Sequence, residues 1–338
     1  MAGILLILLA SLFNGNFTVP MKFTKKWEWE HSWGMWALWA CLILPFIVAY
    51  YSVPDLGQAY SNSSVKDISL TLGAGFVWGL SAIAFGIGVA ETGVAVGFSI
   101  IMGLVITTGT LVPLITKNPE TITTPAGGCI LLGLGAMVVG IVLCGRAGNK
   151  KDKDQIAQTE TSNKSRGAFK RGILMCILAG VFGPMINFSF IFGEPIKNKA
   201  IELGANSFWA NNTIWFITLL GGFVANGGYC LYLMLKKGTV KKYYEQGCFS
   251  HWIMGLLMGV FFTTGILLYG IGTAKIGTLG TSIGWALFQG PTIIVANISG
   301  YLTGEWKNTE KKTVRTMFMG VLVILVGIIL VALSKVVF

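Results

Sequence analysis

Long apolar stretches alternate with short polar ones along the whole chain, and the interiors of the apolar stretches carry no Asp, Glu, Lys or Arg. A helix needs about 20 consecutive apolar residues to cross a hydrocarbon layer that is about 30 Å thick. The first stretch lacks the basic start of a cleavable signal and therefore counts as a true span. The pattern predicts ten transmembrane helices, at 2–21, 33–53, 70–90, 93–115, 126–144, 172–193, 205–235, 251–274, 277–304 and 316–333.

The composition agrees with an all-α membrane protein. Of the 338 residues, 54% are hydrophobic and 12% are charged, and the mean hydropathy is +0.70. Soluble proteins carry about twice that share of charged residues. The six cysteines are scattered without the paired spacing of a zinc site or a disulfide framework. No phosphate-binding loop or nucleophile motif is present, so we expect no enzyme, no catalytic residue, no cofactor and no metal.

The distribution of basic residues predicts the orientation in the membrane. Loops on the cytoplasmic side of a membrane protein carry the excess of Lys and Arg. If the ten spans are correct, alternate loops hold nineteen and six of the twenty-five basic residues. This places both termini in the periplasm of a bacterial inner membrane and the polar linker 147–171 in the cytoplasm. Since the basic residues lie beside the spans, the net charge of +11 does not indicate a nucleic-acid partner.

Two pairs of similar segments predict an internal repeat. The segment 4–13 (ILLILLASLF) resembles 173–182 (ILMCILAGVF), and 86–93 (GIGVAETG) resembles 270–277 (GIGTAKIG). Each half holds an odd number of spans, so the two halves have opposite orientations. Inverted repeats are typical of secondary carriers, whose substrate site lies at the midplane between the repeats. We therefore expect an N-terminal five-helix repeat at 1–146 and a C-terminal one at 172–338.

Neutral polar side chains within the spans are the candidate substrate contacts. An amide in an apolar layer needs a hydrogen-bond partner, which a neighbouring helix or a sugar can provide. Two of these amides lie four residues from a tryptophan, so that amide and indole share a helix face. An aromatic ring beside amide groups suits a sugar with an apolar face and a rim of hydroxyls. The predicted substrate-binding residues are Asn14, Asn16, Asn187, Asn211, Asn212, Trp215, Trp285 and Gln289.

Candidates for proton coupling are few, because the span interiors lack ionisable groups. Glu91 lies between the third and fourth spans, and Glu194 lies at the outer end of the sixth. His31 and His251 lie at the cytoplasmic ends of their spans. Each of these residues has an alternative role as an ordinary interfacial group, because charges leave the hydrocarbon at helix ends.

The stretch after the first span, 20–30 (PMKFTKKWEWE), resembles the corresponding signature of bacterial L-rhamnose:proton symporters in the drug/metabolite transporter superfamily. Further similarities lie at 109–111, 146–148, Trp285 and 305–308. The resemblance implies a fold of two inverted five-helix repeats and proton-coupled uptake of a deoxyhexose. The chain departs from the family pattern in the ninth span, with Thr281 in place of an acidic residue and Gln289 in place of a histidine.

The sequence therefore predicts a secondary transporter that imports a small neutral sugar, L-rhamnose, with protons by alternating access. The partners are the sugar, the proton and the lipid bilayer. An uncoupled facilitator or an exporter of another metabolite is an alternative, since no acidic residue lies within a span. A membrane receptor or structural protein without transport is a second alternative, although no sizeable soluble domain is available for signalling.

Overall fold

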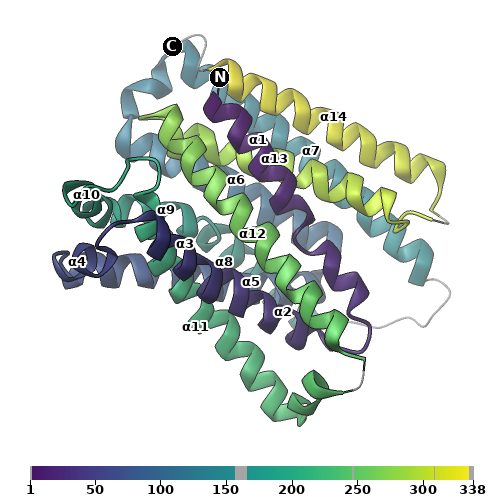
Figure 1. The fold of residues 1–338 in the computed structure, drawn as a ribbon. Helices are drawn as coiled ribbons and strands as arrows, with labels where there is room; N and C mark the ends of the chain where they lie inside the picture. The colour runs from purple at the N-terminus through teal and green to yellow at the C-terminus, as the bar shows by residue number, and fades with distance from the viewer. Residues whose placement is uncertain (1, 157–165, 246, 308, 335–338) are drawn as a thin grey trace. The chain divides into compact units, whose positions relative to one another are not determined.

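The computed structural model describes residues 2–156, 166–245, 247–307 and 309–334, and every regular element in these ranges is helical (Figure 1). The elements are α1 (Ala2–Asn16), η1 (Val19–Phe23), α2 (Trp29–Ala37), η2 (Leu38–Ile43), α3 (Leu44–Ser52), α4 (Leu56–Ser61), α5 (Val65–Thr92), α6 (Val94–Lys117), η3 (Pro119–Thr123), α7 (Pro125–Ile156), α8 (Arg166–Phe182), α9 (Met185–Phe192), α10 (Glu194–Glu202), α11 (Asn211–Lys237), η4 (Val240–Tyr244), α12 (Phe249–Ile276), α13 (Gly280–Leu302) and α14 (Lys311–Leu333).

Nine helical segments in the described ranges are long and apolar enough to cross a membrane. They overlap nine of the ten predicted spans, which confirms a multi-span, all-α membrane protein. The remaining predicted span, 277–304, overlaps α13, a helix of 23 residues that is outside this set. Polar residues such as Gln289 and Asn297 interrupt the apolar sequence of α13. The number of ten spans therefore stays a prediction.

Several predicted spans are interrupted rather than continuous. The second span consists of α2, the π-helical segment η2 and α3, and Pro45 lies in the first turn of α3. Pro184 separates α8 from α9, because proline has no N–H to continue a helix. The sequence pattern predicted that the second span begins at Trp33. In the structure it begins four residues earlier, at Trp29. This correction places Glu30 inside a helix that the sequence pattern had left without an acidic residue.

The chain forms two compact units. Unit 1 comprises 1–80 and 185–275, and unit 2 comprises 81–184 and 276–338. Unit 1 thus takes one segment from each half of the chain, whereas the segment 81–184 of unit 2 crosses the boundary between the halves. Compact units and sequence repeats are different divisions of a chain, so the predicted repeats at 1–146 and 172–338 remain a prediction.

Glycines set the close packing of helices within each unit. In unit 1, a Cβ on Gly75 would lie 1.7 Å from the carbonyl oxygen of Thr218, so that only glycine lets α5 approach α11 this closely. In unit 2, α14 runs along α7 (Figure 1), and Gly133 and Gly327 each lie against the backbone of the opposite helix. Small residues at helix contacts are typical of membrane proteins, because dispersion forces need close approach.

Candidate functional site

A buried group of amide and aromatic side chains lies in unit 1, on α9, α11 and α12. The Asn187 side chain is fully buried, and its Oδ1 accepts a hydrogen bond of 2.6 Å from the Tyr269 hydroxyl. The rings of Phe190 and Trp215 make an edge contact, with centroids 4.8 Å apart. The indole of Trp215 also lies 6.3 Å from the ring of Tyr269. A polar pair is thereby held within an apolar, aromatic surround.

Asn211 and Trp215 lie on the same face of α11, as their spacing of four residues indicates. Asn211 Nδ2 donates a hydrogen bond of 3.1 Å to the carbonyl oxygen of Gly270 on α12. The indole lies against the same glycine, since a Cβ on Gly270 would be 2.7 Å from Trp215 Nε1. The amide of Asn211 therefore joins two helices, which is one of the roles that the sequence left open.

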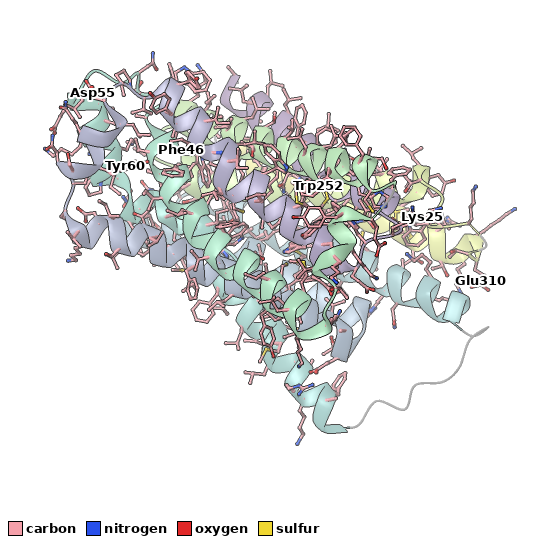
Figure 2. All side chains as sticks on the ribbon, turned by 60° about the horizontal axis from the view of Figure 1, so that its bottom comes forward. Lys25, Phe46, Asp55, Tyr60, Trp252 and Glu310 are labelled. Atoms are coloured by element: carbon pink, nitrogen blue, oxygen red, sulfur yellow. The ribbon has the colours of Figure 1, made fainter. Side chains whose placement is uncertain are left out.

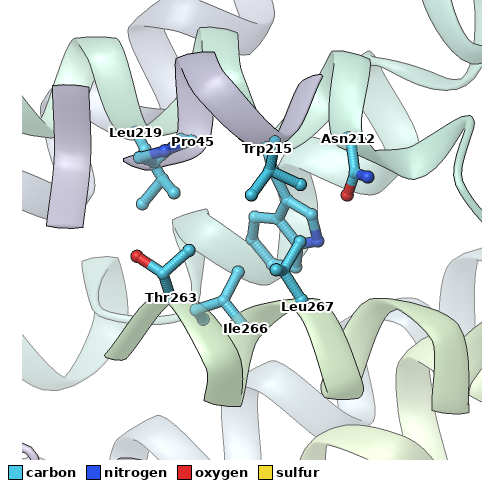
Figure 3. Close-up of a pocket in the computed structure, with 8 residues that line it drawn as sticks. Pro45, Asn212, Trp215, Leu219, Thr263, Ile266 and Leu267 are labelled. Carbon is cyan, nitrogen blue, oxygen red and sulfur yellow. The ribbon is translucent and has the colours of Figure 1, made fainter. Parts of the chain in front are cut away.

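A small cavity of about 10 Å³ lies beside this group, between α3, α11 and α12 (Figure 3). Its walls are formed by Pro45, Val48, Asn212, Trp215, Leu219, Thr263, Ile266 and Leu267. Asn212 Nδ2 donates a hydrogen bond of 2.8 Å to the Ser52 hydroxyl. In the part of the chain that the structure describes, Trp215 Nε1 and Thr263 Oγ1 are buried without a hydrogen-bond partner. Such groups favour a site where a ligand or water completes the hydrogen bonding.

The two amides of α1 differ in their surroundings. Asn14 packs against Gly265 of α12, and its buried Oδ1 has no hydrogen-bond partner among the described residues. Asn16 Nδ2 donates to the carbonyl oxygen of Leu12 on its own helix, at 2.9 Å. Of the two, Asn14 has the acceptor that a ligand hydroxyl could use.

Trp285 and Gln289 lie on α13 in unit 2. The indole of Trp285 is buried, and its Nε1 donates a hydrogen bond of 2.9 Å to the carbonyl oxygen of Val105 on α6. The ring fits against Gly109, where a Cβ would lie 2.2 Å from Nε1. Gln289 is half-buried. The predicted contacts are thus divided between the units, with Trp285 and Gln289 in unit 2 and the others in unit 1.

The two acidic candidates lie at helix ends. Glu91, in the last turn of α5, accepts hydrogen bonds of 2.8 and 3.0 Å from Arg171 Nε, and the two side chains form an ion pair. Glu194 is the first residue of α10, where a negative charge suits the helix dipole. Glu91 therefore has a structural partner that joins α5 to α8.

Sequence reasoning missed Tyr269, Thr263 and Glu30. Tyr269 and Thr263 occupy a helix whose residues are apolar on nearly every face, so their partners are visible only after α11 and α12 pack together. The signal for Glu30 was the acidic pair in WEWE at 27–30, which was assigned to a loop. It lies in the first turn of α2 and is buried.

Comparisons of the sequence with known proteins identify the family of the chain. The model of the family described as L-rhamnose-proton symport protein matches residues 1–336. The L-rhamnose-proton symporters of Yersinia pestis (strain Pestoides F) and Yersinia pseudotuberculosis serotype O:1b (strain IP 31758) are each 28% identical to the chain over 342 residues, covering 98% of it and 97% of the relative. These relatives are transporters, as the sequence predicted, and not enzymes. The chain belongs to the L-rhamnose-proton symport protein family.

Proposed function

We propose that the protein imports L-rhamnose together with protons by alternating access. The family match over 1–336 carries this proposal, because it covers nearly the whole chain rather than one motif. The relatives named above are L-rhamnose-proton symporters, and the chain matches them over almost their full length. The fold supports the same function, since long apolar helices with a few buried amides and indoles are what a carrier of a neutral solute requires.

We place the protein in the bacterial inner membrane, with ten spans, α13 included, and both termini in the periplasm. In unit 1, Lys25 and Trp252 lie at one end, while Asp55 and Tyr60 lie at the other (Figure 2). The end with the basic Lys25 is the one that we assign to the cytoplasm, which supports this orientation. Ion pairs also join loops that the distribution of basic residues assigns to the cytoplasm. These pairs are Lys150 with Glu310, Lys151 with Glu305, Arg171 with Glu91, Lys237 with Glu30 and Lys242 with Glu28.

We also propose the inverted five-helix repeats, and with them a place in the drug/metabolite transporter superfamily. The similar segments at 86–93 and 270–277 end in Gly93 and Gly277, whose φ angles are +91° and +89°. Glycine adopts this left-handed conformation without strain, and each glycine lies between two consecutive long helices. The two segments thus have the same backbone device at the same place, which supports a common origin of the halves.

The sugar site is proposed around the cavity of unit 1. A deoxyhexose carries a methyl group and several hydroxyls, so it suits walls of Leu219, Ile266 and Leu267 beside the free N–H of Trp215 and hydroxyl of Thr263. Small-molecule sites commonly have volumes of about 300–1,000 Å³. The cavity of about 10 Å³ is far smaller, so the site has to widen considerably before the sugar enters. We assign Asn14, Asn187 and Asn212 of unit 1 to the same site.

The test is uptake of radiolabelled L-rhamnose into proteoliposomes of the purified protein, with and without an inward proton gradient. Symport predicts accumulation above equilibrium only with the gradient. Equilibration that is independent of the gradient would indicate an uncoupled facilitator. A lack of rhamnose transport in either condition would contradict the proposal.

A further inference from the structure

A buried ion pair lies at the end of unit 1 where the start of α2 meets the end of α11. Glu30, in the first turn of α2, is only 2% exposed, and its Oε1 lies 2.8 Å from Nζ of Lys237 at the end of α11. The lysine side chain is 47% exposed and reaches water. Burying a carboxylate is unfavourable unless a counter-charge and hydrogen bonds compensate. The charge of Glu30 is thus compensated by one residue from another helix.

Aromatic side chains close this end of the unit around the ion pair. Trp27 Nε1 donates to the carbonyl oxygen of Lys242 at 3.2 Å, and Trp252 Nε1 donates to that of Tyr243 at 3.1 Å. The Tyr243 hydroxyl donates to the carbonyl oxygen of His31 at 3.0 Å. Gly34, one turn after Glu30, leaves room for this hydroxyl, since a Cβ there would lie 3.2 Å from it. We call Trp27, Glu30, Lys237, Tyr243 and Trp252 the clasp.

The ionisable groups around Glu30 come from α11, from η4 and from its own segment. Lys237 and Cys230 face it from α11, and Lys242 and Tyr243 face it from η4. Burial raises the pKa of the Tyr243 hydroxyl, which therefore stays neutral. On its own segment Glu30 is followed by His31, whose Nε2 lies 2.9 Å from the carbonyl oxygen of Thr239. His251 of α12 lies beyond Trp27, with ring centroids 5.4 Å apart.

Glu28 provides an internal comparison, two residues before Glu30. It is 45% exposed and forms its own ion pair with Lys242, at 2.7 Å. The hydrogen bond from Lys242 lowers the pKa of Glu28 and raises that of Lys242. Exposed ion pairs contribute little to stability, whereas removing one partner of a buried pair has a large effect. Protonation of Glu30 therefore has a structural consequence that protonation of Glu28 lacks.

We propose that Glu30 is a proton-coupling residue of this carrier, and that its protonation opens the clasp. The proposal rests on the proposed function, since it assigns the proton of rhamnose symport to a residue. A proton from water binds a carboxylate oxygen and gives a neutral carboxylic acid. The attraction to Lys237 is then lost, and the ammonium group is solvated by the water that it already reaches. Loss of the proton restores the charge and closes α2 against α11 again.

The test compares Glu30→Gln with the matched control Glu28→Gln in proteoliposomes. Two transport modes are measured: accumulation of L-rhamnose driven by a proton gradient, and exchange of internal for external rhamnose without a gradient. Glutamine mimics the protonated acid, so Glu30→Gln should keep exchange within about twofold of wild type. Its gradient-driven accumulation should fall at least about tenfold, to the equilibrium level. Glu28→Gln should retain both modes.

Lys237→Gln is a second variant that keeps the carboxylate. Without Lys237, the attraction that holds the clasp closed is absent at every pH, so the pH dependence of uptake should differ from that of wild type. An unchanged pH profile in Lys237→Gln would overturn the proposal, even if Glu30→Gln does not fold.

Three other results would contradict a proton-coupling role for Glu30. Normal accumulation by Glu30→Gln would overturn the proposal while leaving rhamnose symport intact. Loss of coupling in His31→Asn but not in Glu30→Gln would move the role to the histidine. If the wild-type protein neither exchanges nor accumulates rhamnose, the proposed function fails first, and this proposal fails with it.

Discussion

Trp215 in unit 1 and Trp285 in unit 2 each lie four residues from an amide side chain and are equally buried. They differ in the hydrogen bonding of the indole N–H. Both rings are 2% exposed, and both lie against a glycine of a neighbouring helix, Gly270 and Gly109. The N–H of Trp285 donates to the carbonyl oxygen of Val105, whereas that of Trp215 has no partner among the described residues. The comparison teaches that two tryptophans with equal burial can differ in their polar contacts, because one indole N–H meets a carbonyl oxygen of a neighbouring helix and the other meets none in the described ranges.

The largest effect is expected from Gly109→Ala, which disrupts the packing of Trp285 against α6. The new methyl group would lie 2.2 Å from Trp285 Nε1, so the indole has to move and loses its hydrogen bond. Overpacking of this kind costs about 1–3 kcal/mol. A clear drop in the melting temperature in detergent is the expected result. Gly103→Ala on the same helix is the control, since its nearest neighbour is 3.9 Å away, and equal melting temperatures for both variants would contradict this packing.

Trp285→Phe should lower stability by about 1–2 kcal/mol, because the smaller ring leaves a void and the hydrogen bond to the Val105 carbonyl is lost. The affinity for rhamnose should change little, since this N–H is already used within the protein. Thermal unfolding and rhamnose titration of the same preparation measure both quantities. A large loss of affinity with unchanged stability would show that Trp285 binds the sugar directly.

Trp215→Phe should give the opposite result and so sharpen the comparison. Both substitutions remove the same buried volume, but the Trp215 N–H makes no hydrogen bond within the described protein, so the melting temperature should fall less than in Trp285→Phe. A hydrogen bond to a sugar hydroxyl is worth about 0.5–1.5 kcal/mol, so the dissociation constant should rise about threefold to tenfold. Titration with L-rhamnose measures it. An unchanged constant would remove Trp215 Nε1 from the proposed site.

The smallest effect is expected from Thr263→Val, which replaces a buried hydroxyl by a methyl group of similar size. The hydroxyl has no hydrogen-bond partner in the described chain, so its removal should leave stability unchanged or slightly raise it. If the hydroxyl contacts the sugar, the transport KM should increase about twofold to fivefold. A reduced melting temperature together with an unchanged KM would instead indicate a structural role.

Part of the candidate site could be predicted from the sequence. The amides Asn187, Asn211 and Asn212 stand out because they interrupt apolar stretches, and their burial agrees with that reasoning. Their partners could not be predicted in the same way. Tyr269 is 82 residues from Asn187 in the chain, and no local pattern relates the two. The pairing exists because α9 and α12 pack together.

Glu30 shows a limit of a different kind. A helix boundary moved by four residues changes the interpretation of an acidic residue from a loop group to a buried one. Helix ends depend on backbone hydrogen bonding and on the contacts of the first turn, which hydrophobicity does not report. The lysine that pairs with Glu30 lies at the end of another span, so only packing identifies the pair.

The sequence by itself determined that the protein is helical, crosses a membrane several times and belongs among carriers, because the bilayer requires long apolar helices and the motifs are local. Tertiary structure decided which buried polar groups are hydrogen-bonded within the protein. Among the described residues, the indole N–H of Trp285 has a partner and that of Trp215 has none, because hydrogen bonds between helices depend on side-chain positions to within tenths of an ångström. Such positions follow from packing between distant segments, and no stretch of sequence contains them.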